Sequence, residues 1–163
     1  RTALPDGASQ WITGDAARTD GHAWRKRAGA ILTGMGTVRE DNPRMDVRHV
    51  STALQPLRVV VDSHLSIDPD ANILSPSGRS LVYTTTTDAA RVARLQHNRP
   101  HLEVINLPGN EGGKNDLTAI VQDLAKRGVN ELHVEAGEKL NASLLRAGLV
   151  DEVLLTNPRK EKK

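Results

Sequence analysis

The 163-residue sequence predicts an α/β fold with a mostly parallel central sheet flanked by helices. Short apolar runs typical of buried strands alternate along the chain with helical patterns. Glycines that end helices follow these patterns at Gly29, Gly128 and Gly148. Strand, helix and strand at this spacing indicate right-handed crossovers between parallel strands. With two Trp, one Tyr and no Phe, the core must be aliphatic.

The first elements cluster in the N-terminal third of the chain. A helix is expected over Asp15–Arg27, with Asp15 as its N-cap, and a short strand over Ala30–Thr33. A Gly34-Met35-Gly36 turn follows, then a brief helical turn over Val38–Glu40. Arg58–Asp62 is a continuous apolar run that ends in a polar residue, which is typical of a strand buried on both faces.

The remaining elements continue the alternation. The clearest helix has Leu117, Ile120, Val121 and Leu124 at the spacing of one buried face. The expected strands are Ser80–Thr84, Leu102–Leu107, Glu131–Glu135 and Glu152–Thr156, and the expected helices are Ala89–Gln96, Asp116–Lys126 and Glu138–Arg146.

Composition narrows the class of protein. The length fits one domain, and the Lys-rich end over residues 157–163 reads as a charged tail. The net charge is only +2, and the densest cationic group is Arg25-Lys26-Arg27, which argues against nucleic-acid binding. The absence of cysteine excludes disulfides and thiolate metal sites. No run reaches the length of a membrane span, so we expect a cytoplasmic protein without a membrane partner.

Ligands of parallel sheets bind beyond the carboxyl ends of the strands. The segments that leave those ends are Thr33–Thr37, Asp62–His64 and Glu135–Lys139. The Gly34-Met35-Gly36 segment is either an ordinary tight turn or a turn whose backbone approaches a phosphate. At Glu135-Ala136-Gly137 the carboxylate either caps the next helix or accepts hydrogen bonds from ribose or ribityl hydroxyls.

The basic residues Arg25, Arg44 and Arg48 are candidate phosphate ligands, although most arginines are surface charges. Trp11 reads either as packing or as a residue that contacts a cofactor, and Ser9 can begin a local turn. The six histidines form no metal-binding pattern, so no metal site is expected. The lack of an obvious acid/base pair suits a reaction whose chemistry is carried by a cofactor, such as hydride transfer from a nicotinamide.

Four motifs occur in the order found in one enzyme family: Ser9-Gln10-Trp11-Ile12-Thr13, the segment Gly34–Pro43, Val61-Asp62-Ser63 and Val134-Glu135-Ala136-Gly137. The chain resembles, over nearly its whole length, the reductase domain of the bifunctional riboflavin-biosynthesis deaminase/reductase. This resemblance implies a dihydrofolate reductase-like fold over residues 1–156. It also implies NADPH-dependent reduction of the ribosyl group of 5-amino-6-(5-phosphoribosylamino)uracil to the ribitylamino product.

The resemblance assigns site residues position by position, with no proton donor among them. The implied substrate contacts are Ser9, Arg25, Met45, Arg48 and Glu135, with the two arginines on the 5-phosphate and Glu135 on the sugar chain. The implied NADP contacts are Trp11, Thr37, Asp41, Ser63, Gly137, Glu138, Lys139, Leu140, Asn141, Ala142 and Ser143.

The chain also departs from the family. The family's Ser-Leu-Asp-Gly-like strand before Arg1, its last segment after Leu155 and the zinc deaminase half are all absent from this sequence. We therefore expect a domain that is incomplete at both ends and self-associates into a homo-oligomer. Two other readings stay open: a non-catalytic ligand-binding or assembly fragment, and a reductase of the same fold for a pteridine, which would carry no phosphate for the arginines.

Overall fold

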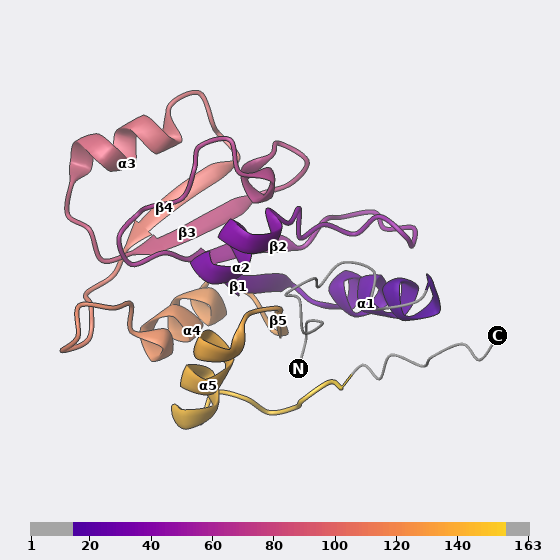
Figure 1. Cartoon of the computed structure of the whole chain (residues 1–163). Helices are drawn as coiled ribbons and strands as arrows, with labels where there is room; N and C mark the ends of the chain where they lie inside the picture. The colour runs from indigo at the N-terminus through magenta and orange to yellow at the C-terminus, as the bar shows by residue number, and fades with distance from the viewer. Residues whose placement is uncertain (1–14, 156–163) are drawn as a thin grey trace.

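The structure, a computed structural model, describes residues 15–155. In this range five parallel strands form one sheet in the order β4-β3-β2-β1-β5 (Figure 1). The strands are β1 (Ala30–Gly34), β2 (Leu57–Val61), β3 (Ser80–Thr84), β4 (Leu102–Asn106) and β5 (Leu132–Val134). The helices are α1 (Asp15–Arg27), α2 (Met35–Asp41), α3 (Ala89–Gln96), α4 (Leu117–Lys126) and α5 (Glu138–Arg146), with a 3-10 turn η1 (Asn72–Leu74).

Both faces of the sheet are covered, which explains the continuous apolar runs in its central strands. On one face, Ile31, Val60 and Val82 pack in a buried cluster with residues of α2, η1 and α3. On the other face, Leu32 and Leu81 pack with residues of α4 and α5. Figure 1 shows α4 and α5 on one side of the sheet, α2 and α3 on the other, and α1 beside β1.

The predicted elements from α1 to α5 are all present, with small shifts at their ends. Helix α4 begins after Asp116 because that side chain is its N-cap and accepts the N–H groups of Thr118 and Ala119. The expected Gly34-Met35-Gly36 turn is instead a direct passage from β1 into α2, with Gly34 as the N-cap.

The predicted strand at Glu152–Thr156 is wrong over its described residues, because residues 152–155 belong to no strand or helix. A strand requires a neighbour to pair with its backbone. Among the described strands the sheet ends at β5, and Val153 and Leu155 remain 63% and 90% exposed. Thr156 and the predicted tail lie outside the described residues.

No helix within residues 15–155 combines the length and the apolar character needed to cross a membrane.

Candidate functional site

The predicted site segments follow three neighbouring strands. Strand β1 pairs with β2 on one side and with β5 on the other, all parallel, so their carboxyl ends share one edge of the sheet. The start of α2, the turn at Ser63 and the segment from Glu135 to Gly137 all leave that edge. The backbone N–H of Glu135 donates to the carbonyl of Leu32 at 3.0 Å, which places Glu135 beside β1.

The centre of the candidate site is an ion pair between α1 and the end of β5. Arg25 donates through Nε and Nη2 to the two carboxylate oxygens of Glu135, each at 2.6 Å. The same guanidinium donates through Nη1 to the backbone carbonyl of Asp46 at 3.0 Å, and Nη2 lies 3.9 Å from the sulfur of Met45. Three segments that are distant in the sequence therefore meet at Arg25.

The Arg25–Glu135 pair is largely buried, so each side chain strongly affects the pKa of the other. The side chains of Arg25 and Glu135 are 15% and 27% exposed. Burial alone would raise the pKa of Glu135, but hydrogen bonds from Arg25 and His133 outweigh it and lower the pKa to about 2. Burial opposes the charge of Arg25 as well, yet Glu135 raises its pKa. Glu135 is therefore ionised throughout the neutral range.

The segment 46–49 forms the neighbouring wall of the site. Arg48 forms an ion pair with the carboxylate of Asp46, and the Arg48 side chain remains 44% exposed. The backbone N–H of Arg48 donates to Nδ1 of His22 in α1 at 3.2 Å. Gln55 anchors the same stretch, because its amide both accepts from the N–H and donates to the carbonyl of Val47.

The beginnings of α2 and α5 lie close together at the same edge. A Cβ added at Gly34 would lie 3.0 Å from Cδ2 of Leu140, so only a small residue fits comfortably where the two helices approach. Gly36 and Gly137 have open space around them. Neither helix has a side-chain cap at its N-cap glycine, and the first backbone N–H groups of a helix have no partner within it.

The predicted cofactor residues 137–143 divide into two groups. Gly137, Glu138 and Lys139 are exposed at the start of α5. The others serve α5 itself: Asn141 donates to the carbonyl of Ala136 at 2.8 Å, and the Ser143 hydroxyl donates to the carbonyl of Lys139 at 2.8 Å. Leu140 packs with the buried cluster that includes Leu144. The exposed first turn is the part of this segment that a ligand can approach.

Ser63 organises the edge after β2. Its carbonyl accepts from the hydroxyls of Thr84 and Thr85 at 3.0 and 2.9 Å. Its hydroxyl oxygen accepts the backbone N–H of Asn115 at 3.0 Å and keeps its own proton to donate. The preceding Asp62 is buried and its carboxylate accepts from Ser66 and Ile67, so it shapes the turn rather than facing a ligand.

A hollow of about 500 Å³ continues the same edge beyond β3 and β4. Thr86 follows the end of β3, Asn106 is the last residue of β4, and α3 supplies the apolar wall through Ala89 and Val92. None of the predicted contacts lines this hollow. The predicted contacts among the described residues therefore lie outside this hollow.

The sequence-predicted residues fall into two neighbouring groups. Arg25 contacts both Glu135 and Met45, and Arg48 is joined to Arg25 through Asp46. Thr37, Ser63 and the start of α5 lie along the sheet edge, and Asp41 is exposed at the last position of α2. Ser9 and Trp11 lie outside the described residues.

Sequence reasoning missed three polar residues of the site: His22, Asp46 and His133. His133 Nε2 lies 3.3 Å from Oε1 of Glu135. Two of the three were detectable from spacing. His22 is three residues before Arg25 and so shares its helix face, and His133 is two residues before Glu135 and so shares its strand face.

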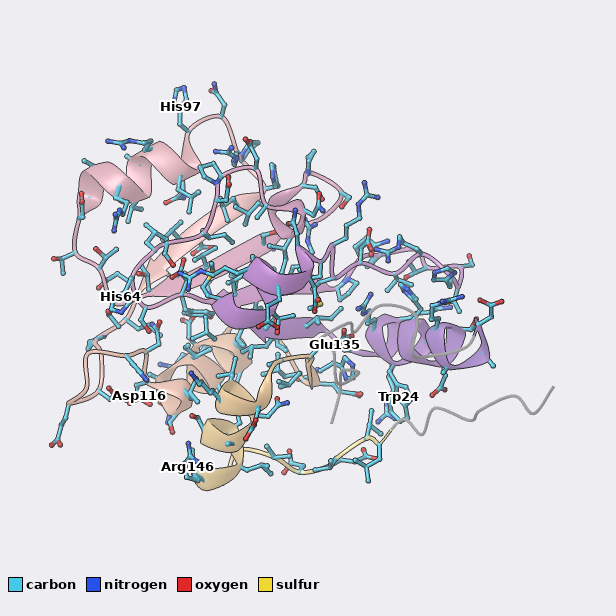
Figure 2. The ribbon with its side chains drawn as sticks, in the orientation of Figure 1. Trp24, His64, His97, Asp116, Glu135 and Arg146 are labelled. Atoms are coloured by element: carbon cyan, nitrogen blue, oxygen red, sulfur yellow. The ribbon has the colours of Figure 1, made fainter. Side chains whose placement is uncertain are left out.

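Figure 2 shows Glu135 at the level of β1, between α1 and the start of α5. Within residues 15–155 no three His, Asp or Glu side chains are grouped in a way that could hold a metal ion.

Comparison with known proteins assigns the chain to a family. The family model described as the RibD C-terminal domain matches residues 1–157. The riboflavin biosynthesis protein RibD of Escherichia coli K12 is 34% identical over 167 residues, which cover 95% of this chain and 44% of that protein. RibD of Bacillus amyloliquefaciens is 32% identical over 155 residues, which cover 94% of this chain and 40% of that protein. The chain thus spans less than half the length of these relatives.

Solved structures agree with the fold. Acinetobacter baumannii RibD superposes with a TM-score of 0.74 at 29% identity, over 97% of this chain and 44% of that one. A Thermotoga maritima diaminohydroxyphosphoribosylaminopyrimidine deaminase/5-amino-6-(5-phosphoribosylamino)uracil reductase gives a TM-score of 0.72 at 26% identity, over 90% and 38%. The α/β, dihydrofolate reductase-like fold expected from the sequence is confirmed. The chain belongs to the RibD C-terminal domain family.

Proposed function

We propose that this chain is a reductase of riboflavin biosynthesis. It transfers hydride from NADPH to the ribosyl group of 5-amino-6-(5-phosphoribosylamino)uracil and forms the ribitylamino product. The observation that carries the proposal is the cluster of Arg25, Glu135 and Arg48 at one edge of the sheet, in a chain of the RibD C-terminal domain family.

The ionised state of Glu135 sets its part in the reaction. The imine nitrogen of the open-chain sugar first takes up a proton. When the imine carbon then accepts hydride, the electron pair of the C=N bond moves to nitrogen and the neutral amine forms. Glu135 holds no proton to give near neutral pH, so water or a substrate hydroxyl supplies it. The carboxylate instead stabilises the positive charge of the protonated imine and accepts a sugar hydroxyl.

Glu135 has room for that hydroxyl. Among the described residues its Oε2 accepts only from Arg25, while Oε1 accepts from Arg25 and faces His133. A carboxylate oxygen has two acceptor positions, so Oε2 keeps one for the substrate. Arg25 fixes the orientation of the carboxylate through its two parallel hydrogen bonds.

Arg48 is the main ligand of the substrate phosphate. Arg25 already donates to Glu135 and to Asp46, whereas Arg48 has a single ion pair with Asp46 and a half-exposed guanidinium. A phosphate dianion competes with one carboxylate for Arg48 more readily than it displaces the bidentate pair of Arg25. Arg25 then contributes mainly the positive potential behind the site.

The residues at the sheet edge fit a dinucleotide. The uncapped start of α5 with the open space at Gly137 suits a pyrophosphate, and the Ser63 hydroxyl is free to donate. NADPH, when bound, supplies the hydride. The protein supplies orientation: the α5 start and Ser63 hold the cofactor, while Glu135 and Arg48 hold the sugar carbon and its phosphate.

The test is the reaction itself. We expect the chain, with NADPH and 5-amino-6-(5-phosphoribosylamino)uracil, to oxidise NADPH and to form the reduced ribitylamino product, identified by mass spectrometry. A dihydropterin or dihydrofolate substrate serves as the control for a pteridine reductase. NADPH oxidation with the pterin alone would reject the proposal. Binding of both ligands without any reduced product would support the non-catalytic alternative instead.

A further inference from the structure

His22 occupies a position that its role as a helix residue does not explain. It is the only buried residue of α1, with 6% of its surface exposed. Its Nδ1 is 3.2 Å from the backbone nitrogen of Arg48, and its ring meets the ring of His49 edge-on with centroids 4.6 Å apart. The imidazole thus lies between the helix that carries Arg25 and the segment that carries Arg48.

The hydrogen bond defines the state of the ring. A backbone N–H can only donate, so Nδ1 must accept, and the ring proton is on Nε2 of a neutral imidazole. Burial lowers the pKa of His22 to about 4, with smaller lowering from electrostatic interactions with Arg25, His49 and Arg48, and an opposing effect of Asp46. These are the charged and titratable groups that face it, from its own helix and from the segment 46–49.

The geometry points to His22 as a positioning residue: it fixes the segment 46–49, and with it the backbone of Arg48, against the helix that carries Arg25. Arg25 and His22 are three residues apart and therefore project from the same side of α1. Arg25 donates to the carbonyl of Asp46 and His22 accepts the N–H of Arg48. Together they hold this segment by both kinds of backbone group. The inference rests on the proposed function only where it concerns substrate.

Two substitutions separate the hydrogen bond from the packing. His22→Leu removes the hydrogen-bond acceptor and fills the same space with an apolar side chain of similar bulk. His22→Asn places an amide oxygen near the position of Nδ1, accepts the same N–H, and does not titrate. His49→Asn is the matched control, because His49 is exposed and touches His22 only through its ring.

Hydrogen exchange of the backbone amides reports whether the segment 46–49 is held in place, and it does not depend on activity. We expect His22→Leu to lose protection at residues 46–49, while His22→Asn and His49→Asn keep it. In the reductase assay, His22→Leu should raise the KM for the phosphorylated substrate about five- to tenfold, the size expected for a lost hydrogen bond. The KM for NADPH should stay within about twofold, and His22→Asn should restore the substrate KM.

Three results would overturn the inference: unchanged protection at residues 46–49 in His22→Leu, equal defects in His22→Leu and His22→Asn, or an unchanged substrate KM in a variant that has lost protection. An inactive wild-type chain would reject the proposed function, and hydrogen exchange would still decide whether His22 fixes the segment.

Discussion

At the scale of single residues, the proposed reaction depends on how Glu135 is held. Its two oxygens each receive a hydrogen bond of 2.6 Å from Arg25, and the neighbouring His133 lies 3.3 Å away. This arrangement keeps the carboxylate ionised and fixed, as stabilisation of a positive transition state requires. The sequence identified both partners but not their contact, because they are 110 residues apart.

We predict that Glu135→Gln lowers kcat much more than it changes the KM for NADPH. The amide keeps the shape but removes the charge, and a charged hydrogen bond contributes about 1.5–3 kcal/mol, so kcat should fall about ten- to a hundredfold. Steady-state kinetics with each substrate varied in turn measures both constants. A large rise in the KM for NADPH with kcat unchanged would show that Glu135 serves the cofactor.

Arg48 and Arg44 offer a matched pair for the phosphate. Arg48 borders the site through Asp46, whereas Arg44 is exposed and makes no hydrogen bond or ion pair among the described residues. Arg48→Ala should raise the substrate KM about tenfold or more, the cost of one charge-assisted contact, and Arg44→Ala should leave it unchanged. Initial rates at varied substrate concentration test this. Equal effects of the two substitutions would contradict a specific phosphate contact.

The lowered pKa of His22 also links stability to pH. Below its ordinary pKa of 6.5 the unfolded chain protonates this residue, while the folded chain does so only near pH 4. The unfolded state therefore binds more protons, and the free energy of unfolding should fall as the pH drops from 6.5 towards 4. The contribution of Glu135 is lost only below its ordinary value of 4.5, as the pH falls towards 2.

Between pH 6.5 and 4.5 the two effects separate, and only His22 of this pair contributes. Urea unfolding of the wild type and of His22→Asn across this window is the measurement. We expect a steeper loss of stability in the wild type, because asparagine does not titrate. Parallel curves would mean that His22 keeps its ordinary pKa in the folded state.

At the scale of elements, two glycines of the β1–α2 junction have different roles. Gly34 lies where α2 and α5 approach, and a Cβ there would be 3.0 Å from the end of the Leu140 side chain. Gly36 is inside α2 with open space around it. We predict that Gly34→Val destabilises the fold by about 1–3 kcal/mol through overpacking, because the Leu140 side chain, which packs against the buried cluster, must shift to make room.

Gly36→Ala is the matched control, and it should stabilise the fold by about 0.5–1 kcal/mol because alanine suits a helix interior better than glycine. Chemical denaturation measures both changes. If the backbone at the start of α2 also approaches the cofactor, Gly36→Ala will raise the KM for NADPH although the protein is more stable. A destabilised Gly36→Ala together with a tolerated Gly34→Val would reverse this account of the junction.

Elements with a strong periodic pattern could be predicted from the sequence, because the pattern is itself the consequence of burial on known faces. The apolar face of α4 is the example. Contacts between elements could not be predicted from the sequence. Arg58 stands at the edge of an apolar run, yet it is 1% exposed and donates to Ser75 and to the carbonyl of Gly78. Only the fold brings those acceptors within reach, and no local pattern encodes them.

At the scale of the whole molecule, the sequence predicted that the candidate site segments share one edge of the sheet, because parallel strands direct all their carboxyl ends the same way. It could not show that Arg25 and His22 of α1 contact Glu135 and Arg48, because these contacts join residues far apart along the chain. The strand prediction was wrong for residues 152–155. Their apolar side chains are typical of a strand, but this segment pairs with no strand of the described sheet.

That stretch leads to a prediction about assembly. Val153 and Leu155 are 63% and 90% exposed and lie close together in sequence, whereas Leu54 is 82% exposed in a different loop. Adjacent exposed apolar side chains favour association, and single ones are ordinary at a protein surface. We expect the chain to self-associate as its concentration rises, and the double substitution Val153→Glu with Leu155→Glu to shift it towards the monomer. Leu54→Glu should leave the equilibrium unchanged. Light scattering over a range of concentrations measures this, and a wild-type mass that stays monomeric throughout would contradict a role for this segment in assembly.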